Sequence, residues 1–292
     1  MKKVILDTDI GSDIDDAFCL AYLLAHPACD LLGVTTVSGE SQKRAELASA
    51  LCRHAGKDIP IYAGVEQPLL IPQKQPHARQ HAAISGWPHG SGFSSDAVGF
   101  LRQLILDNPH EITLLAIGPL TNVAVLFAAD RRIPSLLKEL VIMGGRFKNA
   151  MPGLLPAEWN ILCDPHAAQI VLAAMTQRMR CIGLDVTLQV KIPKADLAER
   201  MRSHLLQPVA DFAKEWRSDI VTFHDPLAAA VIFEQDLCGY ERGKAEVELK
   251  SDRLAGLTHW DADPEGGHSA AVSVDAERFF AHYFDVVGKV VL

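Results

Sequence analysis

Several features that mark common protein classes are missing from this sequence of 292 residues. Its six cysteines form no C-x-x-C pair, so we expect buried reduced thiols rather than zinc ligands or disulfides. No run of Lys and Arg stands out, and 36 acidic residues against 28 basic ones give a formal charge of −8. Nucleic acid is therefore not an expected partner, whereas a cation suits the excess of carboxylates.

Long apolar runs are also missing. No apolar stretch approaches the ~20 residues that a membrane-spanning helix needs. Strand-like residues begin almost at Met1, with no apolar signal segment ahead of them, so we expect a cytoplasmic protein with no membrane partner. No repeat, low-complexity tract or linker divides the sequence, which favours one domain over residues 1–292.

Short apolar runs alternate with helical patterns along the chain. Strands are predicted at Val4–Leu6, Leu31–Val37, Ile112–Ile117, Leu140–Met143 and Cys181–Leu184. Helices are predicted at Asp15–His26, Ser41–His54, Leu120–Ala129 and Pro165–Ala174. This pattern favours an α/β fold with a mostly parallel central sheet flanked by helices. Pro68–Ser95 is predicted to be a long loop, and Lys148–Pro156 a second irregular stretch.

A cluster of aspartates directly follows the first predicted strand. Five of the ten residues from 7 to 16 are Asp7, Asp9, Asp13, Asp15 and Asp16. One or two of them could favour the N-terminus of the next helix. Five such carboxylates repel one another unless a positive charge lies among them. Because oxygen ligands favour hard cations, the cluster indicates a site for Ca²⁺ or Mg²⁺ at the carboxyl end of a strand.

Two familiar motifs with similar openings fit poorly. An EF-hand requires Gly at the sixth loop position and Glu at the twelfth, where this chain has Ser12 and Phe18. A phosphatase of the haloacid-dehalogenase type also follows its first strand with Asp-x-Asp. That family normally continues with a pair such as Gly-Thr, unlike Ile10-Gly11, and its later acidic pair is not found here.

The segment Asp7–Ala17 (DTDIGSDIDDA) resembles the opening motif of the inosine–uridine-type nucleoside hydrolases. Further stretches match this family in the same order over nearly the whole chain, and the shared order makes the resemblance specific. They are Val34–Gly39 (VTTVSG), His89–Phe93 (HGSGF), Ile117–Asn122 (IGPLTN), Met143–Gly145 (MGG), Glu158–Asp164 (EWNILCD) and His224–Pro226 (HDP).

The resemblance implies a Rossmann-like fold and calcium-dependent hydrolysis of the N-glycosidic bond of ribonucleosides to ribose and free base. In this family Ca²⁺ holds the attacking water and the ribose 2′- and 3′-hydroxyls. The implied ligands are Asp9, Asp16, Asp225 and the backbone carbonyl of Ile117, and Asp9 is also the implied base. The family further implies a homodimer or homotetramer.

Other matched positions are implied to contact the substrate. Asp15, Glu158 and Asn160 match sugar-contacting positions, where carboxylates favour the oxocarbenium character of the sugar. His224 matches the general acid proposed in part of the family, and imidazole titrates near neutrality. His89 is the residue of the long loop that best fits a contact with the nucleobase.

Some of these residues also have structural interpretations. Asp225-Pro226 is a good N-cap and N1 pair for a helix, and Asn122 could cap a helix or pack within the core. Gly144-Gly145 is predicted to permit a tight turn after a strand rather than to act in catalysis.

Three departures from the family pattern concern the substrate. Asp13 lengthens the opening motif and is interpreted as a solvated loop charge. Glu40 stands where many members have Asn, and it would contact a sugar hydroxyl, alter the metal's coordination or point to solvent. Met151–Pro156 lacks the Asn that usually precedes Glu158 and contacts the ribose 5′-hydroxyl, although Asn149 lies nearby.

Two alternatives to ribonucleoside hydrolysis stay open at this point. Another ribosyl or pentosyl conjugate could be the substrate, as Glu40 and Leu154 allow. A calcium-dependent sugar-binding protein without turnover is the other alternative, and the presence of both Asp9 and His224 argues against it.

Overall fold

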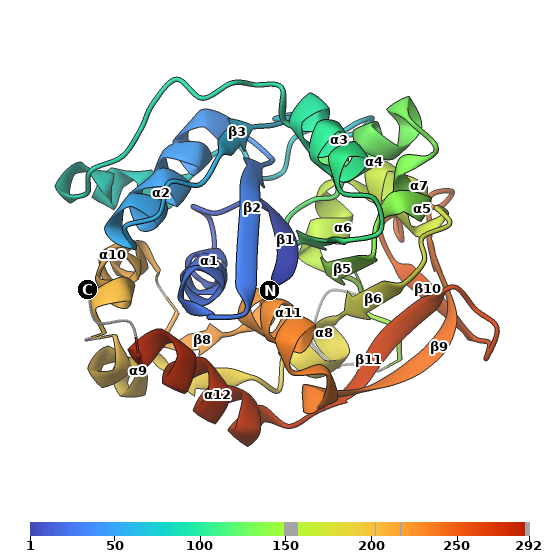
Figure 1. Cartoon of the computed structure of the whole chain (residues 1–292). Helices are drawn as coiled ribbons and strands as arrows, with labels where there is room; N and C mark the ends of the chain where they lie inside the picture. The colour runs from blue at the N-terminus through green and yellow to red at the C-terminus, as the bar shows by residue number, and fades with distance from the viewer. Residues whose placement is uncertain (149–156, 202, 217, 290–292) are drawn as a thin grey trace.

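A computed structural model describes residues 1–148, 157–201, 203–216 and 218–289 of the chain. Within these residues, nine strands form one sheet (Figure 1). Their order is β10 (Thr258–Ala262), β9 (Cys238–Val247), β11 (His268–Val274), β6 (Met179–Ile182), β5 (Glu139–Met143), β4 (Ile112–Ala116), β1 (Lys2–Thr8), β2 (Cys29–Thr36) and β3 (Ile61–Ala63). The sheet is parallel from β3 to β11 and antiparallel only where β9 and β10 complete it, which confirms the mostly parallel sheet.

Helices flank this sheet, as the sequence predicts (Figure 1). The α-helices are α1 (Asp15–Ala25), α2 (Ser41–His54), α3 (Ala97–Asp107), α4 (Thr121–Ala129), α5 (Ile133–Leu136), α6 (Trp159–Cys163), α7 (Pro165–Leu172), α8 (Leu184–Thr187), α9 (Lys194–Arg200), α10 (Gln207–Phe212), α11 (His224–Phe233) and α12 (Ala276–Gly288). The 3₁₀ helices are η1 (Arg79–Gly86), η2 (His204–Leu206), η3 (Ala213–Glu215) and η4 (Gln235–Leu237). A separate small sheet pairs β7 (Lys191–Pro193) with β8 (Ile220–Thr222).

Strand β1 shows why the apolar runs form a sheet that is covered on both faces. Successive side chains of a strand point to opposite faces. Val4 and Leu6 pack into the core shared by α1, α2, α11 and α12, whereas Ile5 packs into the core beneath α3, α4 and α7. All three are fully buried. A buried strand of this kind requires apolar residues in succession rather than in alternation.

The predicted elements are found with small shifts at their ends. Helix α2 matches its predicted range, and α1 ends one residue earlier than expected. Strand β6 runs from Met179 to Ile182 instead of Cys181–Leu184, because Gly183 and Leu184 begin helix α8. The loop at Pro68–Ser95 contains the 3₁₀ helix η1 and no strand.

Two predictions from composition can be compared with the structure. All six cysteines are buried and free, which confirms reduced thiols. Within the described residues, the longest apolar helices fall short of what a membrane crossing requires. Asn149, Met151–Pro156 and Leu154, on which the interpretation of the ribose 5′-end depends, lie outside the described residues.

Candidate active site

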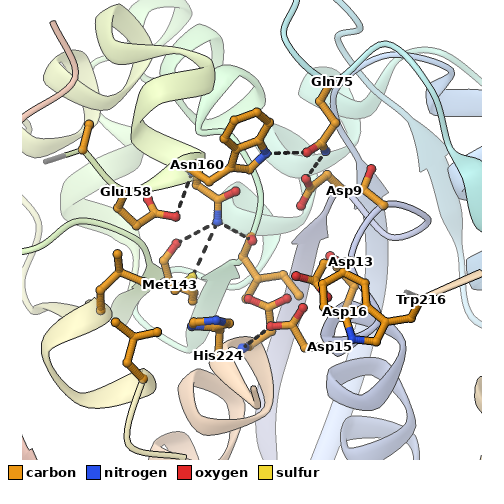
Figure 2. Close-up of a pocket in the computed structure, with 17 residues that line it drawn as sticks. Asp9, Asp13, Asp15, Asp16, Gln75, Met143, Glu158, Asn160, Trp216 and His224 are labelled. Carbon is orange, nitrogen blue, oxygen red and sulfur yellow. Dashed lines mark hydrogen bonds between the residues drawn. The ribbon is translucent and has the colours of Figure 1, made fainter. Parts of the chain in front are cut away.

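A cavity of about 610 Å³ lies at the carboxyl ends of the parallel strands (Figure 2). Asp9 and Ile117 reach it from directly beyond β1 and β4, and Met143 from the end of β5. This is where open α/β sheets bind their ligands. Eight of the ten predicted site residues line the cavity, namely Asp9, Asp15, Asp16, Ile117, Glu158, Asn160, His224 and Asp225.

The loop between β1 and α1 places the aspartates at one wall of the cavity. Gly11 allows the turn, because its φ of 115° disfavours residues with a side chain and an added Cβ would lie 2.8 Å from Leu47. Thr8 donates from Oγ1 to Oδ1 of Asp16 at 2.5 Å. Asp15 and Asp16 occupy the first turn of α1, where the helix dipole favours negative charge.

Arg44 of α2 lies fully buried beneath this loop. Its Nη1 donates to the carbonyl oxygens of Asp9 and Ile10, and its Nε donates to the carbonyl of Gly39 at 2.8 Å. The guanidinium also donates to Oγ of Ser12 at 3.0 Å. Arg44 therefore fixes the backbone that carries Asp9, although the sequence offered no motif that singled it out.

Three carboxylates from two distant segments meet in the cavity. Asp15, Asp16 and Asp225 each offer an oxygen atom, and these atoms all lie within 4.8 Å of one another. Stacking of Phe18 on Phe223, with ring centroids 4.8 Å apart, joins α1 to the start of α11. The family resemblance implies a sugar contact for Asp15, and in the structure Asp15 lies directly with the other two aspartates. Buried oxygen donors of this kind could hold a hard metal ion.

The charge of these three carboxylates is poorly compensated within the chain. Burial raises the pKa of Asp15, Asp16 and Asp225 well above the usual range, and repulsion among the neighbouring aspartates adds to the increase. No Lys or Arg is among the described residues that line the cavity. A bound cation would favour the ionised carboxylates and reverse this effect.

Asp9 lies outside that group of three, but its side chain interacts with that of Asp16. Its Oδ2 accepts a hydrogen bond from Nε2 of Gln75. Burial raises the pKa of Asp9 as well, while the charge of Arg44 acts in the opposite direction. A Cβ at Gly118 would lie 2.7 Å from Oδ1 of Asp9, so only glycine leaves room for the carboxylate there.

Glu158 and Asn160 form the opposite wall. Glu158 caps α6, accepting from the backbone N–H of Asn160 at 2.8 Å and of Gly145 at 3.1 Å. Burial raises the pKa of Glu158 to about 6. The side-chain nitrogen of Asn160 donates to the carbonyls of Ile117 at 2.8 Å and Met143 at 3.2 Å, so its side-chain oxygen faces away from these carbonyls. Two polar side chains are thereby held rigidly at the cavity.

His224 is the first residue of α11 and is held by Thr187, whose Oγ1 lies 2.7 Å from Nδ1 of the imidazole. Burial lowers the pKa of His224 to about 4, so its ring is neutral at pH 7. The expectation of titration near neutrality is therefore corrected, because the imidazole has lost the water that stabilises its charged form. Phe223 precedes the helix, so Asp225-Pro226 does not form the alternative N-cap pair.

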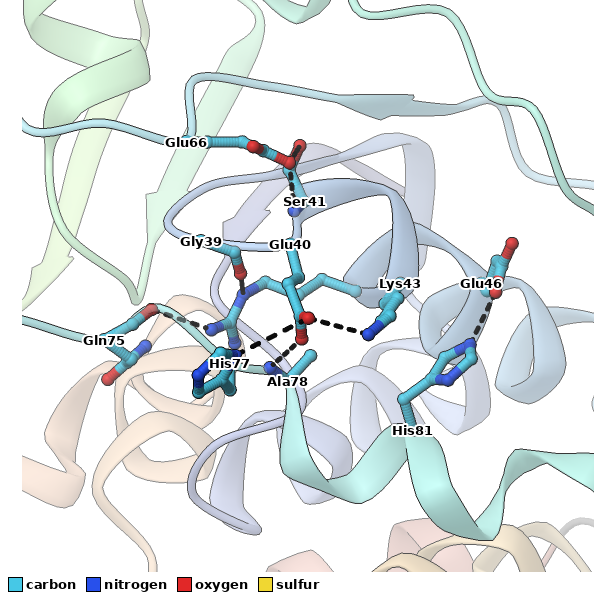
Figure 3. Close-up of polar contacts among 11 residues, drawn as sticks. Gly39, Glu40, Ser41, Lys43, Glu46, Glu66, Gln75, His77, Ala78 and His81 are labelled. Atoms are coloured by element: carbon cyan, nitrogen blue, oxygen red, sulfur yellow. Dashed lines mark hydrogen bonds and ion pairs between the residues drawn. The ribbon is translucent and has the colours of Figure 1, made fainter. Parts of the chain in front are cut away.

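The structure does not bring Glu40 to the cavity (Figure 3). Glu40 has a φ of 60°, and its Oε2 accepts from the backbone N–H of Ala78 at 2.9 Å. Its Oε1 accepts from Lys43 at 2.7 Å, and this bond contributes most to lowering the pKa of Glu40 to about 2. The carboxylate thus ties the long loop to the start of α2 instead of reaching a sugar or a metal.

His89 is also absent from the described cavity lining. Its Nδ1 is 2.7 Å from the backbone carbonyl of Trp87, its neighbour on the loop. Asn122, by contrast, proves to be a packing residue, since it donates to Asp7 at 2.7 Å and to the carbonyl of Thr36 at 3.0 Å. It does not cap α4, which follows Leu120.

Several lining residues escaped the sequence analysis. Asp13 lines the cavity and is half-buried, so its interpretation as a solvated charge was wrong. Trp159 lies within the matched EWNILCD stretch, where its position beside Glu158 was an available signal. Gln75 and Trp216 belong to segments without a motif, and no feature of the sequence points to them.

Comparison with known proteins agrees with this geometry. Residues 4–281 match the family described as inosine-uridine preferring nucleoside hydrolase. Uridine nucleosidase 1 of Arabidopsis thaliana is 32% identical, over 94% of this chain and 90% of that protein. The inosine-uridine preferring nucleoside hydrolase of Crithidia fasciculata is 30% identical, over 99% of this chain and 98% of that protein.

Solved structures show the same relationship. A plant nucleoside hydrolase, the PpNRh1 enzyme, superposes with a TM-score of 0.85 at 28% identity, over 99% of both chains. The similarity thus includes both the sheet and the segments that surround the cavity. The chain belongs to the family of inosine–uridine-preferring nucleoside hydrolases, enzymes that act on N-glycosyl bonds.

Proposed function

We propose that this protein is a calcium-dependent hydrolase that splits ribonucleosides into ribose and free base. The observation that carries the proposal is the buried group of Asp15, Asp16 and Asp225, which faces Glu158 and Asn160 across one cavity. Uridine and inosine are the first substrates to consider, because the names of the similar enzymes include them.

The residues present fit a calcium ion. Asp16 and Asp225 would hold it with Asp9 and the backbone carbonyl of Ile117, all of which line the cavity. Calcium accepts six to eight oxygen ligands, so Asp15 can join this set or bind the sugar from beside it. When bound, the ion supplies the positive charge that lowers the pKa of a water molecule in the site.

The carboxylates would then perform the hydrolysis. Asp9 takes a proton from the water as the water oxygen bonds to C1′ of the ribose. The bond from C1′ to the base breaks, and its electron pair leaves with the base. Asp15 and Glu158 face the positive charge that develops on the sugar, and Asn160 positions a hydroxyl.

His224 would act on the departing base. A neutral imidazole has one donor and one acceptor nitrogen. If Nδ1 accepts from the hydroxyl of Thr187, then Nε2 carries the hydrogen and can donate to the base. In this proposal His224 stabilises the leaving group as a hydrogen-bond donor, and it does not need to be charged beforehand.

Release of free base and free sugar from a panel of purine and pyrimidine ribonucleosides, with calcium and with a chelator, tests this function. We expect release that stops with the chelator. A folded protein that binds calcium and releases nothing from the panel would contradict the proposal, and would favour another ribosyl conjugate or a binding role.

We also propose a homodimer or homotetramer, by family resemblance, which light scattering would test.

A further inference from the structure

The side chain of Gln75 bridges the two walls of the cavity (Figure 2). It is 8% exposed. Its Nε2 donates to Oδ2 of Asp9, and its Oε1 accepts from the indole Nε1–H of Trp159 at 2.6 Å. A residue of the long loop therefore contacts both the aspartate after β1 and the first residue of α6.

The chemistry of the two partners determines how the amide is oriented. An indole N–H can only donate, so it must face the amide oxygen. The ionised carboxylate of Asp9 can only accept, so it must face the amide nitrogen. The hydrogen bond to Trp159 thus fixes the direction in which Gln75 presents its donor to Asp9. Neither partner accommodates the flipped amide.

The backbone of Gln75 is held as firmly as its side chain. Its N–H donates to Oε1 of Gln73 at 2.7 Å, and its carbonyl accepts from Oγ of Ser38 at 3.3 Å. That carbonyl also accepts from Nη2 of Arg44 at 3.5 Å, the guanidinium that holds the backbone of Asp9. The buried guanidinium of Arg44 therefore holds the backbone of both Gln75 and Asp9, whose side chains are hydrogen-bonded to each other.

The loop is fastened again a few residues further along (Figure 3). Glu40 accepts from the N–H of Ala78 at 2.9 Å. Gln80 donates from its backbone to the carbonyl of Gly11 at 3.0 Å and from its side chain to the carbonyl of Asp13 at 2.7 Å. Between residues 75 and 80 the long loop is therefore hydrogen-bonded both to the loop between β1 and α1 and to Glu40.

We propose that Gln75 is a positioning residue for hydrolysis, which acts by fixing the carboxylate of Asp9. This inference rests on the proposed function, in which Asp9 takes the proton from water. A base that is free to rotate spends much of its time in unproductive orientations. With Oδ2 held by Gln75, the carboxylate keeps one orientation and Oδ1 is the oxygen that receives the proton. Trp159 contributes by holding the amide of Gln75.

Two substitutions test the bridge from its two ends. Gln75→Met keeps the length of the side chain and removes the amide. Trp159→Phe keeps an aromatic ring and removes the N–H donor. Gln67→Met is the matched control, because Gln67 is an exposed glutamine immediately before the same loop. Steady-state kinetics on the ribonucleoside that the wild-type protein hydrolyses gives kcat and KM for each variant, and thermal melting verifies that each is folded.

We expect Gln75→Met to lower kcat at least about tenfold with KM changed less than about threefold, since an orienting contact acts on the chemical step. Trp159→Phe should lower kcat by a smaller factor. The double variant should have the kcat of Gln75→Met within about twofold, because the two groups act through one contact. Gln67→Met should match the wild-type protein in both constants.

An NMR measurement tests the hydrogen bond between Gln75 and Trp159 without depending on enzymatic turnover. The indole N–H signal of Trp159 in a ¹H–¹⁵N NMR spectrum is assigned as the one missing from Trp159→Phe. It should shift in Gln75→Met and not in Gln67→Met. An unshifted signal would overturn the bridge. A kcat of Gln75→Met within twofold of the wild-type value would overturn the positioning role of Gln75 and leave the proposed function intact. Absence of turnover in the wild-type protein would overturn the proposed function itself.

Discussion

Two buried groups of charges lie at opposite ends of the parallel strands and are built differently. At the start of β5, Glu139 accepts from Nε and Nη2 of Arg180 at 2.6 and 2.8 Å. Glu139 is 6% exposed and Arg180 is fully buried. At the carboxyl ends of the strands, Asp15, Asp16 and Asp225 are gathered with no Lys or Arg among the described lining residues.

The difference indicates what each group is for. A buried ion pair that the chain completes itself has all its charge balanced when the protein folds. A group of like charges that the chain leaves unbalanced is costly on its own, and either protonation or a bound cation relieves the repulsion. The charges of Glu139 and Arg180 are therefore balanced within the fold, whereas the aspartates serve the chemistry of the cavity in the proposed function.

Among substitutions at the cavity, Asp9→Asn should have the largest effect on the rate of hydrolysis. Asparagine keeps the shape of the side chain but cannot take a proton from water. General-base catalysis typically contributes 10²–10⁴-fold, so we expect kcat for ribonucleoside hydrolysis to fall by about 10³-fold in a protein that remains folded. Release of free base measured at saturating calcium gives the answer. A variant with wild-type rates would remove Asp9 from the mechanism.

Arg180→Met should have the largest effect on the free energy of unfolding. Among the residues that the structure describes, the substitution leaves the half-exposed Arg178, 3.0 Å away, as the remaining ion-pair partner of the buried Glu139. Removing one partner of a buried ion pair typically costs about 3–5 kcal/mol. Urea denaturation should show a loss of this size. A loss below about 1 kcal/mol would mean that Glu139 does not depend on Arg180 to balance its charge. Replacing both residues by apolar ones should restore most of the stability, because no buried charge is then left unpaired.

Asp7 is intermediate between these two groups of charges. It is buried without a cationic partner among its described hydrogen-bond donors, but neutral side chains donate hydrogen bonds to its carboxyl group. Oδ1 accepts from Thr35 at 2.5 Å and from Asn122 at 2.7 Å. Burial raises the pKa of Asp7 to about 7. The native protein therefore keeps a proton that the unfolded chain loses near pH 4, and the resulting stability is lost as pH rises toward 7.

Asp7→Asn removes this titration. In the presence of a chelator, the variant should gain about 2 kcal/mol relative to the wild-type protein between pH 5 and pH 7. Urea denaturation of both proteins at the two pH values measures the difference. A difference that is independent of pH would show that Asp7 is already ionised at pH 5.

Asp225→Asn in the presence of a chelator should have the smallest effect and the opposite sign to Arg180→Met. Removing one of three mutually repelling carboxylates relieves repulsion, so we expect a gain in stability that is smaller than the loss in Arg180→Met. Urea denaturation without calcium provides the measurement. A marked loss of stability would mean that Asp225 has a compensating partner in the metal-free protein.

Local sequence was sufficient for the parts of the site that lie next to strands. The apolar run of β1 and the aspartates after it are adjacent in the chain, so the carboxyl-end rule placed Asp9, Asp15 and Asp16 correctly at the cavity. Asp225 and Glu158 are distant in sequence, and only the family resemblance placed them there. Burial is not visible in local sequence, which is why the lowered pKa of His224 was not foreseen.

Contacts between loops were beyond the reach of the sequence. Gln75 contacts Asp9, which lies 66 positions earlier in the chain, through a loop without periodicity, and no pattern marks such a pairing. Glu40, which stands where many family members have Asn, was expected to contact a sugar hydroxyl, alter the metal's coordination or point to solvent. Its left-handed backbone instead turns the carboxylate toward Ala78. The antiparallel strands β9 and β10 were missed as well, since their exposed and buried residues give no continuous apolar run.

The most direct test of the central claim is the melting temperature of the wild-type protein in calcium and in chelator. An ion that binds only the folded state stabilises it by about 2.7 kcal/mol at a concentration of 100 times Kd. We predict a rise of roughly 5–10 °C with calcium, because 1 kcal/mol corresponds to about 2–4 °C for a chain of 150–250 residues. Identical melting in both solutions would contradict the assignment of the aspartates to a cation.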